Sequence, residues 1–476
     1  MIFDLAILGG GPAGYVAAEK AGNAGLSVVL FEKQELGGVC LNEGCIPTKA
    51  LLNCAKTYEH ALHGKPFGVS AEGVQADFGA MMERKKRVVR RLVGGVKSRM
   101  KGAGVTVVKA EATITGKAAG SFGLNAAGED YSAAHLLICT GSSAVVPPIP
   151  GLRESEAVLT SREILSLTQR PESLTVIGGG VIGMEFASFF NSLGTKVSVI
   201  EMMPKILGPM DAEVSAALQG IYAKKGVDFH LGCQVTAVNG NTVVFEVPEG
   251  TADGASDGAL CHQRAVRKGQ CSLVAEGTAN GTAECKITSE VILCCVGRKA
   301  NLTGYGLETL GLNCERGIEV DSHMRTSVPG VYAAGDVTGF SMLAHTASRE
   351  AEVAVNDILG VSDEMRYDAI PGVVYTTPEV AGVGVTEEQA PEGSTIRKLP
   401  MAYSGRYVAE NEDITGLCKI IGGPDGRIIG LHMLGTPCSE IIQSGCIAIE
   451  AGLTAGQLEK VVFPHPTVSE IIKETL

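Results

Sequence analysis

A chain of 476 residues with 45% hydrophobic and 19% charged residues has the composition of a folded protein with roughly two to four domains. Its formal charge of -12 argues against a nucleic-acid surface, because phosphate binding needs clustered lysine and arginine. No stretch of roughly 18 uninterrupted apolar residues is present, so we expect no membrane span. The N-terminus carries Asp4 and lacks a basic start. We therefore expect no secretion signal, and we predict a cytoplasmic protein.

The N-terminal segment predicts a dinucleotide-binding site. "FDLAILGG" is typical of a buried parallel strand, and it runs into Gly9, Gly11 and Gly14 in a GxGxxG pattern. A predicted helix, "YVAAEKAGNAG", and a second strand ending at Glu32 follow. Such glycines let the backbone approach a pyrophosphate at the helix N-terminus, and the acid accepts hydrogen bonds from a ribose.

Two cysteines five positions apart come next, in "GGVCLNEGCIPTKALL". In a regular helix, Cα atoms five residues apart are roughly 8–9 Å from each other, beyond the ~7 Å that a disulfide tolerates. A bond between Cys40 and Cys45 therefore requires a distorted segment, which Asn42 and Gly44 permit, or a segment that lies before a helix begins. Pro47 suits the first turn of a helix, so we expect Cys45 just ahead of a helix N-terminus. The helix dipole and nearby Lys49 favour a thiolate there.

The spacing leaves a structural disulfide, a metal site and a redox pair open. A metal site needs two more ligands, and no CxxC or HxH motif lies nearby. Most of the fourteen cysteines lie in apolar segments such as "LLICTG", and without an export signal we expect a reducing compartment and free thiols. We therefore favour a redox pair.

A second dinucleotide unit is predicted from "SLTVIGGGVIGMEFASFFNSLGTKVSVIE", with Gly178, Gly180, Gly183 and the terminal acid Glu201. Two such sites suggest hydride transfer between a nicotinamide and a flavin. A carboxylate at position 201 suits the 2′-hydroxyl of NAD and repels the 2′-phosphate of NADP. Only Lys205 follows to offset that charge, so we predict NAD.

The C-terminal segment "FPHPTVSE" places His465 between two prolines and Glu470 five residues later. Dithiol chemistry needs a proton acceptor, because only the thiolate is nucleophilic. A carboxylate on one ring nitrogen would orient the other, so we predict His465 as a base and Glu470 as its partner.

These motifs, together with "CCVGRKAN", "GVYAAGDV", "MLAHTAS" and "VVYTTPEVAGVG", cover nearly the whole chain. The chain resembles the flavin disulfide reductases, and among them the dihydrolipoamide dehydrogenases. The resemblance implies an α/β fold with two Rossmann-like dinucleotide-binding domains and a C-terminal α+β dimerisation domain. The expected domains are an FAD-binding domain at 1–149, an NAD-binding domain at 150–285, a central domain completing the FAD site at 286–345 and an interface domain at 346–476.

The resemblance also implies roles for single residues around the redox pair. Cys40 would exchange with substrate, and Cys45 would lie against the flavin as a charge-transfer donor. Lys49 would lie near the flavin N5 and pair with Glu185.

Further cofactor residues follow from the same resemblance. Asp336 would bind the ribityl chain of FAD, the backbone up to Ala347 would border the flavin pyrimidine, and Gly297 would contact a cofactor. The histidine loop of the family comes from the neighbouring subunit, which implies an obligate homodimer.

Three features depart from the family pattern. Phe463 stands where many members have a second histidine, and Thr346 stands where lysine is expected. The segment 247–285 is long and rich in Gly, Ala and Ser, so we expect an elaborated hairpin or mobile loop, with Cys261 and Cys271 as bystanders.

The predicted function is the oxidation of dihydrolipoyl groups, with electrons passing through the Cys40–Cys45 disulfide and FAD to NAD+. No lipoyl module precedes the first glycine motif, so the expected partner is the lipoyl-carrying subunit of a 2-oxoacid dehydrogenase complex or the H protein of glycine cleavage. The alternatives are an NADPH-dependent relative such as glutathione reductase, which Glu201 disfavours, and a non-catalytic assembly subunit, which the intact motifs disfavour. Mercuric and large thioredoxin reductases would carry a C-terminal cysteine pair or redox tail, which "VSEIIKETL" lacks.

Overall fold

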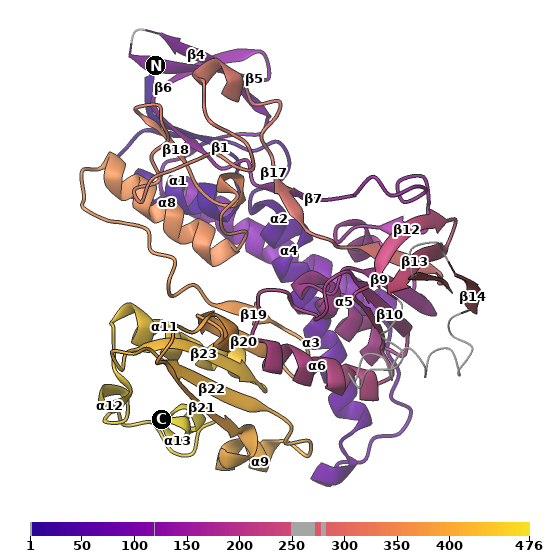
Figure 1. The fold of residues 1–476 in the computed structure, drawn as a ribbon. Coiled ribbons are helices and arrows are strands. Elements are labelled where there is room, and N and C mark those ends of the chain that lie inside the picture. Colours follow the sequence, from indigo (N-terminus) through magenta and orange to yellow (C-terminus); the bar gives the residue numbers. More distant parts are fainter. Residues whose placement is uncertain (1, 119, 249–271, 278–281) are drawn as a thin grey trace. The chain divides into compact units, whose positions relative to one another are not determined.

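The chain forms two compact units in a computed structural model that describes residues 2–118, 120–248, 272–277 and 282–476 (Figure 1). Each unit combines three separate stretches of the chain. Unit 1 consists of Met1–Ala50, Met82–Val145 and Gly297–Arg366, and unit 2 consists of Leu51–Met81, Val146–Val296 and Tyr367–Leu476.

Unit 1 is built on a seven-stranded sheet in the order β3-β2-β1-β6-β5-β4, with β18 also paired to β6. The pairs among β1, β2, β3, β6 and β18 are parallel, whereas β4, β5 and β6 pair antiparallel. A core of buried aliphatic and aromatic side chains covers this sheet. The strands are β1 Ile2–Leu8, β2 Val28–Phe31, β3 Thr106–Val108, β4 Ala112–Ala118, β5 Ser121–Ala126, β6 Glu129–Ile138 and β18 Val331–Ala333.

Helices α1 and α8 lie side by side against this sheet (Figure 1). The buried face of α1 is made of alanine and glycine, and these small side chains allow close packing. Two of the limits between the units fall within the residue ranges of α3 and α4. The remaining elements of unit 1 and these two helices are α1 Pro12–Asn23, α2 Gly38–Glu43, α3 Cys45–Leu62, α4 Phe78–Gly102, β7 Ser142–Ala144, β17 Arg298–Ala300, the 3₁₀ turns η3 Leu307–Leu310 and η4 Asp336–Thr338, and α8 Ala344–Ile358.

Unit 2 begins with a five-stranded parallel sheet in the order β11-β10-β9-β16-β8, followed by a four-stranded antiparallel sheet in the order β12-β13-β15-β14. Helices α5 and α6 follow β9 and β10. The elements are η1 Lys65–Phe67, β8 Val158–Leu159, η2 Glu163–Ser166, β9 Ser173–Ile177, α5 Val181–Ser192, β10 Lys196–Glu201, α6 Ala212–Lys224, β11 Asp228–Leu231, β12 Gln234–Asn239, β13 Thr242–Pro248, β14 Ser272–Gly277, β15 Thr282–Thr288 and β16 Val291–Cys294.

The C-terminal part of unit 2 is a five-stranded antiparallel sheet in the order β19-β20-β23-β22-β21, with short helices packed on it. Its elements are β19 Gly372–Val374, β20 Val380–Gly384, η5 Glu387–Gln389, β21 Thr395–Pro400, η6 Met401–Tyr403, α9 Gly405–Glu410, β22 Leu417–Gly422, β23 Ile428–Leu434, α10 Cys438–Ile441, α11 Gln443–Glu450, α12 Ala455–Leu458 and α13 Glu470–Thr475.

The fold class and both predicted strand–turn–helix–strand units are confirmed. The compact units divide the chain after Ala50, Met81, Val145, Val296 and Arg366. The four expected domains, with limits at 149, 285 and 345, stay a prediction. Within the units, β16 joins the parallel sheet through β9, and α8 packs against α1. The residues of the segment 247–285 that the structure describes belong to β13, β14 and β15 of the four-stranded sheet. Cys261 and Cys271 lie outside the described residues.

Candidate active site

The first glycine turn connects β1 to α1 and leaves room where an anion would bind. Gly9 has φ +104°, and a Cβ there would lie 2.2 Å from the carbonyl oxygen of Cys139. A Cβ on Gly14 would lie 1.8 Å from the oxygen of Gly9, so both positions require glycine. Gly11 precedes α1, has no side-chain cap, and a Cβ there would meet only one atom, at 3.9 Å. The helix N-terminus therefore offers backbone N–H groups and space to a pyrophosphate.

The acid at the end of β2 locks this turn in place. Glu32 Oε2 accepts the N–H of Gly10 at 2.8 Å, and Oε1 accepts the N–H of Gln34 at 2.7 Å. A carboxylate has about four acceptor positions. Two positions therefore remain for further donors, and the binding of ribose hydroxyl groups by Glu32 stays a prediction.

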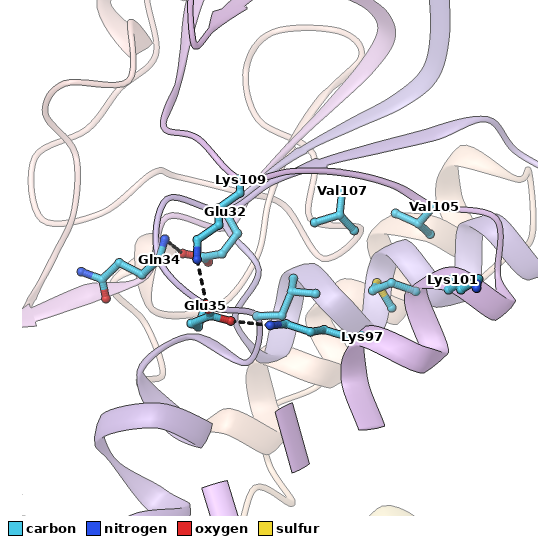
Figure 2. A pocket seen from close by; sticks show the side chains of 10 residues that line it. Glu32, Gln34, Glu35, Lys97, Lys101, Val105, Val107 and Lys109 are labelled. Carbon is cyan, nitrogen blue, oxygen red and sulfur yellow. Dashed lines mark hydrogen bonds and ion pairs between the residues drawn. The ribbon is translucent and has the colours of Figure 1, made fainter. Parts of the chain in front are cut away.

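A cavity of about 390 Å³ opens beside Glu32 (Figure 2). Apolar side chains and lysines line it, and Glu35 bridges Lys97 and Lys109 within it. Hydrogen bonds from these two lysines lower the pKa of Glu35 to about 2. The cavity gives the ribose end of the first site room for a flat, largely apolar group such as a nucleotide base.

The second glycine turn repeats this construction between β9 and α5. Gly178 has φ +107°, and a Cβ there would lie 2.7 Å from the oxygen of Cys295. A Cβ on Gly183 would lie 2.1 Å from the oxygen of Gly178, whereas a Cβ on Gly180 would meet nothing within 4 Å. The start of α5 therefore has the same open, uncapped N–H groups as α1.

Glu201 holds the second turn as Glu32 holds the first. Its Oε2 accepts the N–H of Gly179 at 2.6 Å, and its Oε1 accepts the N–H of Met203 at 2.7 Å. The Lys205 ammonium donates to the carbonyl oxygen of Met210 at 2.5 Å. The one cation of the segment after Glu201 is thus engaged elsewhere, which fits a hydroxyl-bearing ribose better than a phosphorylated one.

Cys40 and Cys45 face each other across a break between two helices of unit 1. Cys40 lies in α2, and Cys45 is the first residue of α3. The sequence predicts Cys45 just ahead of the helix, but the backbone turns at Gly44, with φ −141° and ψ −107°, and the helix therefore starts one residue earlier than expected. Both side chains are half-buried. A hydrogen bond with the Cys45 side chain and then burial raise the pKa of Cys40, and Lys49 opposes this rise.

Tyr15 on α1 also lies near this pair, and sequence reasoning missed it. Burial and then the charge of Cys40 raise the pKa of Tyr15, while Arg99 lies 5.7 Å from its ring centroid and opposes the shift. The only signal in the sequence is its position directly after the glycine motif.

Asp336 belongs to a polar cluster that the sequence did not reveal. The Ser142 hydroxyl donates to the Asp336 carboxylate, and Arg298 donates to the oxygen atoms of Ser142 through Nε and Nη2, each at 2.7 Å. The backbone N–H of Gly335 donates to the fully buried Glu350 on α8 at 2.6 Å. These contacts fix the turn that carries Asp336.

Three further predicted residues take defined positions. Ala347 is buried on α8, and its Cβ would lie 3.3 Å from a Cβ added to Gly335. Gly297 has φ +134° and directly precedes β17. Glu185 is buried on α5 of unit 2 and accepts the N–H of Tyr375 at 3.1 Å, whereas Lys49 belongs to unit 1. The Lys49–Glu185 pair stays a prediction.

The histidine and its carboxylate partner meet in unit 2 as predicted. His465 Nδ1 lies 3.0 Å from Glu470 Oε1, and Glu470 Oε2 accepts the N–H of Thr467 at 2.8 Å. Both contacts lower the pKa of Glu470, with the backbone N–H first. The imidazole is 80% exposed, so its other nitrogen is open to a further partner.

Within the described part of the chain, no group of three or more His, Cys, Asp or Glu residues could hold a metal ion. In the same residues, no helix has both the length and the apolar character needed to cross a membrane.

Residues 3–351 match the family described as pyridine nucleotide-disulphide oxidoreductase, and residues 370–476 match the dimerisation domain of that family. The chain therefore belongs to the pyridine nucleotide-disulphide oxidoreductases, whose cofactors are FAD and NAD, and its two glycine turns fit these two dinucleotides.

Individual relatives agree with this assignment. The chain is 37% identical to dihydrolipoyl dehydrogenase from Chlorobaculum tepidum, over 99% of this chain and 96% of the relative. It is 36% identical to the mitochondrial dihydrolipoyl dehydrogenase of Canis lupus familiaris, over 99% and 89%. A solved HOCl-induced flavoprotein disulfide reductase from Escherichia coli superposes with a TM-score of 0.81 at 26% identity, covering 99% of each chain.

Proposed function

We propose that this protein oxidises protein-bound dihydrolipoyl groups and passes the electrons to NAD+. The observation that carries the proposal is the contact between the Cys40 and Cys45 side chains, in the unit that also bears the first glycine turn. The relatives named dihydrolipoyl dehydrogenase match almost the whole chain, which supports the same substrate class.

The thiol chemistry balances with the two cysteines alone. A thiolate of the substrate dithiol attacks the Cys40–Cys45 disulfide at Cys40, and Cys45 leaves as a thiolate. The second substrate thiol then displaces Cys40, so that substrate disulfide and the reduced cysteine pair are formed. When bound, FAD would supply the two-electron relay between this cysteine pair and NAD+. Lys49, one turn further along α3, places positive charge beside the pair and favours the thiolate.

We assign the removal of the substrate proton to His465. Glu470 holds Nδ1 of the ring, so the exposed Nε2 can accept a proton from a thiol. Because the C-terminal residues match a dimerisation domain, we propose a homodimer in which this loop serves the cysteine pair of the second subunit.

The turn around Asp336 is proposed to hold the ribityl chain of FAD, with Ala347 beside the flavin ring. Ser142 and Arg298 fix the carboxylate, so it is oriented before the cofactor binds. The external partner is proposed to be the lipoyl-carrying subunit of a 2-oxoacid dehydrogenase complex or the H protein of glycine cleavage. The cytoplasmic location stays a prediction.

The direct test is the initial rate of NAD+ reduction by dihydrolipoamide with FAD-loaded protein. We expect turnover of about 10 s⁻¹ or more. The matched control is Cys54→Ser, which alters a buried thiol on the same helix and should keep this rate. Absence of turnover, with flavin and both cysteines intact, would overturn the lipoyl assignment and point to other disulfides with NADPH.

A further inference from the structure

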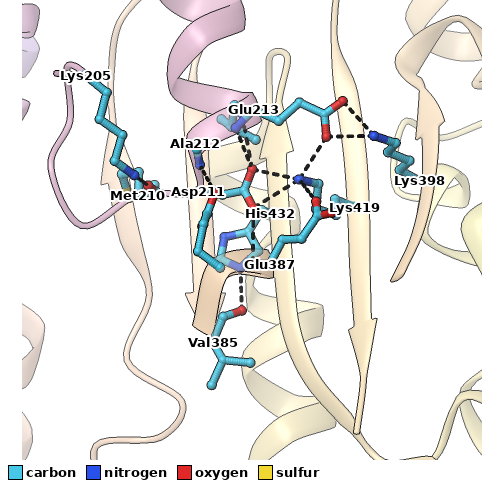
Figure 3. A network of polar contacts seen from close by, with 12 residues as sticks. Lys205, Met210, Asp211, Ala212, Glu213, Val385, Glu387, Lys398, Lys419 and His432 are labelled. Atoms are coloured by element: carbon cyan, nitrogen blue, oxygen red, sulfur yellow. Dashed lines mark hydrogen bonds and ion pairs between the residues drawn. The ribbon is translucent and has the colours of Figure 1, made fainter. Parts of the chain in front are cut away.

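A buried ion cluster in unit 2 joins the C-terminal antiparallel sheet to the coenzyme-binding part of the same unit (Figure 3). At its centre is Lys419 on β22, whose side chain is 1% exposed. Its ammonium lies 2.9 Å and 3.1 Å from the two carboxylate oxygens of Asp211, 2.6 Å from Glu387 and 2.9 Å from Glu213. Separating these buried charges would leave an ion without a partner away from water, which is strongly destabilising, so the cluster holds its side chains in place.

Asp211 is at the same time the N-cap of α6. Its Oδ1 accepts the N–H groups of Glu213 at 3.1 Å and Val214 at 3.3 Å. The Glu388 carboxylate accepts the N–H of Ala212, the first residue of α6, at 3.1 Å. The first turn of α6 is thus tied to the C-terminal sheet by side chains from both sides.

The segment 202–210 leads from the coenzyme acid Glu201 to this anchored cap. Within it, Leu207 is fully buried, and its N–H donates to the oxygen of Gly179 at 2.9 Å. Gly179 is also the residue whose N–H binds Glu201, so the segment binds the carbonyl of this glycine while the coenzyme acid binds its N–H. Leu207 has φ +57°, which is unfavourable for a residue with a side chain and has to be held by its surroundings.

We propose that Lys419 is a positioning residue for the NAD+ site. By binding Asp211 it holds the end of the segment 202–210, and the segment holds the glycine turn and Glu201 in the geometry that binds the coenzyme. This inference rests on the proposed function, because it assigns NAD+ to the second glycine turn. Lys419 acts through Asp211 and Leu207 and itself touches no part of that turn.

Lys398 provides a matched control within the same cluster. It is the register partner of Lys419 on the neighbouring strand β21, and its ammonium binds Glu213 at 3.0 Å and 3.1 Å. Its side chain is 51% exposed, and none of its described contacts is to Asp211. It therefore contributes charge to the cluster but does not hold the cap.

The test compares Lys419→Met, Asp211→Asn, the double variant and Lys398→Met as FAD-loaded enzymes. Two quantities are measured: the KM for NAD+ at saturating dihydrolipoamide, and the rate at which dihydrolipoamide reduces the enzyme without NAD+. Lys419→Met should raise the KM for NAD+ by about tenfold and leave the reduction rate unchanged. Asparagine still caps a helix, so Asp211→Asn should raise the KM similarly without melting α6. Lys398→Met should behave as wild type.

The double variant decides whether the contact itself matters. Because both single changes remove the same ion pair, the double variant should raise the KM no further than either one. If the folded single variants keep the wild-type KM, or if KM, kcat and the reduction rate all worsen together, the positioning role is wrong. Should Lys419→Met fail to fold, Asp211→Asn decides alone. A wild-type protein that cannot reduce NAD+ at all would instead refute the proposed function.

Discussion

Replacing Glu201 by glutamine should weaken NAD+ binding specifically. The carboxylate uses one acceptor position for Gly179 and one for Met203, which leaves two for the ribose hydroxyls. The amide keeps a single acceptor oxygen and no charge. A hydrogen bond to a charged group contributes about 1.5–3 kcal/mol. The KM for NAD+ should therefore rise about 10- to 100-fold.

The assay is the initial rate of NADH formation over a range of NAD+ concentrations, at saturating dihydrolipoamide. The change should raise KM far more than it lowers kcat, and it should increase the relative use of NADP+, because the carboxylate no longer repels a 2′-phosphate. Glu32→Gln is the matched control, since its carboxylate makes the same two backbone contacts at the first turn. That variant should lose FAD instead. An unchanged KM for NAD+ in flavin-loaded Glu201→Gln would mean that the coenzyme ribose is recognised elsewhere.

Three further changes test other parts of the site. Cys45→Ser should abolish dithiol oxidation while FAD stays bound, as measured by turnover and by flavin absorbance. Glu470→Gln should lower kcat on the order of 100-fold, because His465 loses the partner that orients it, with the flavin spectrum unchanged. Burial lowers the pKa of His432 in the folded protein below the ordinary histidine value of 6.5. Below pH 6.5 this histidine therefore binds a proton more readily in the unfolded chain than in the folded protein. The urea midpoint should therefore fall as the pH drops below 6.5, and His432→Gln should flatten this dependence.

The parts of the site that depend on local sequence were predictable. Each glycine turn, its helix and its acid lie within one short stretch, so the residue pattern alone determines their geometry. The polar cluster at Asp336 was not predictable, because Ser142 lies 194 positions away from Asp336 and 156 away from Arg298. Nothing in a local pattern indicates which distant hydroxyl will meet which carboxylate.

The start of one helix and the pairing of one strand were not predictable for a similar reason. Cys45 was expected ahead of its helix and is instead its first residue, because the break at Gly44 sets where α3 starts. The strand Val291–Cys294 joins the parallel sheet through a pairing with a strand more than a hundred residues earlier. Its place therefore depends on the assembled sheet and not on the adjoining sequence.

The three-part make-up of unit 1 has a consequence for its synthesis. The central sheet takes strands from the first and second stretches and β18 from the third stretch, which also contains α8. A ribosome must therefore release the chain as far as Arg366 before this unit can close. Until then, the sheet that contains the apolar strands of the first stretch lacks the neighbouring strands that have not yet been translated. Folding is expected to be slow and late, and chaperones that shield exposed strand edges during translation should increase the yield of the expressed protein.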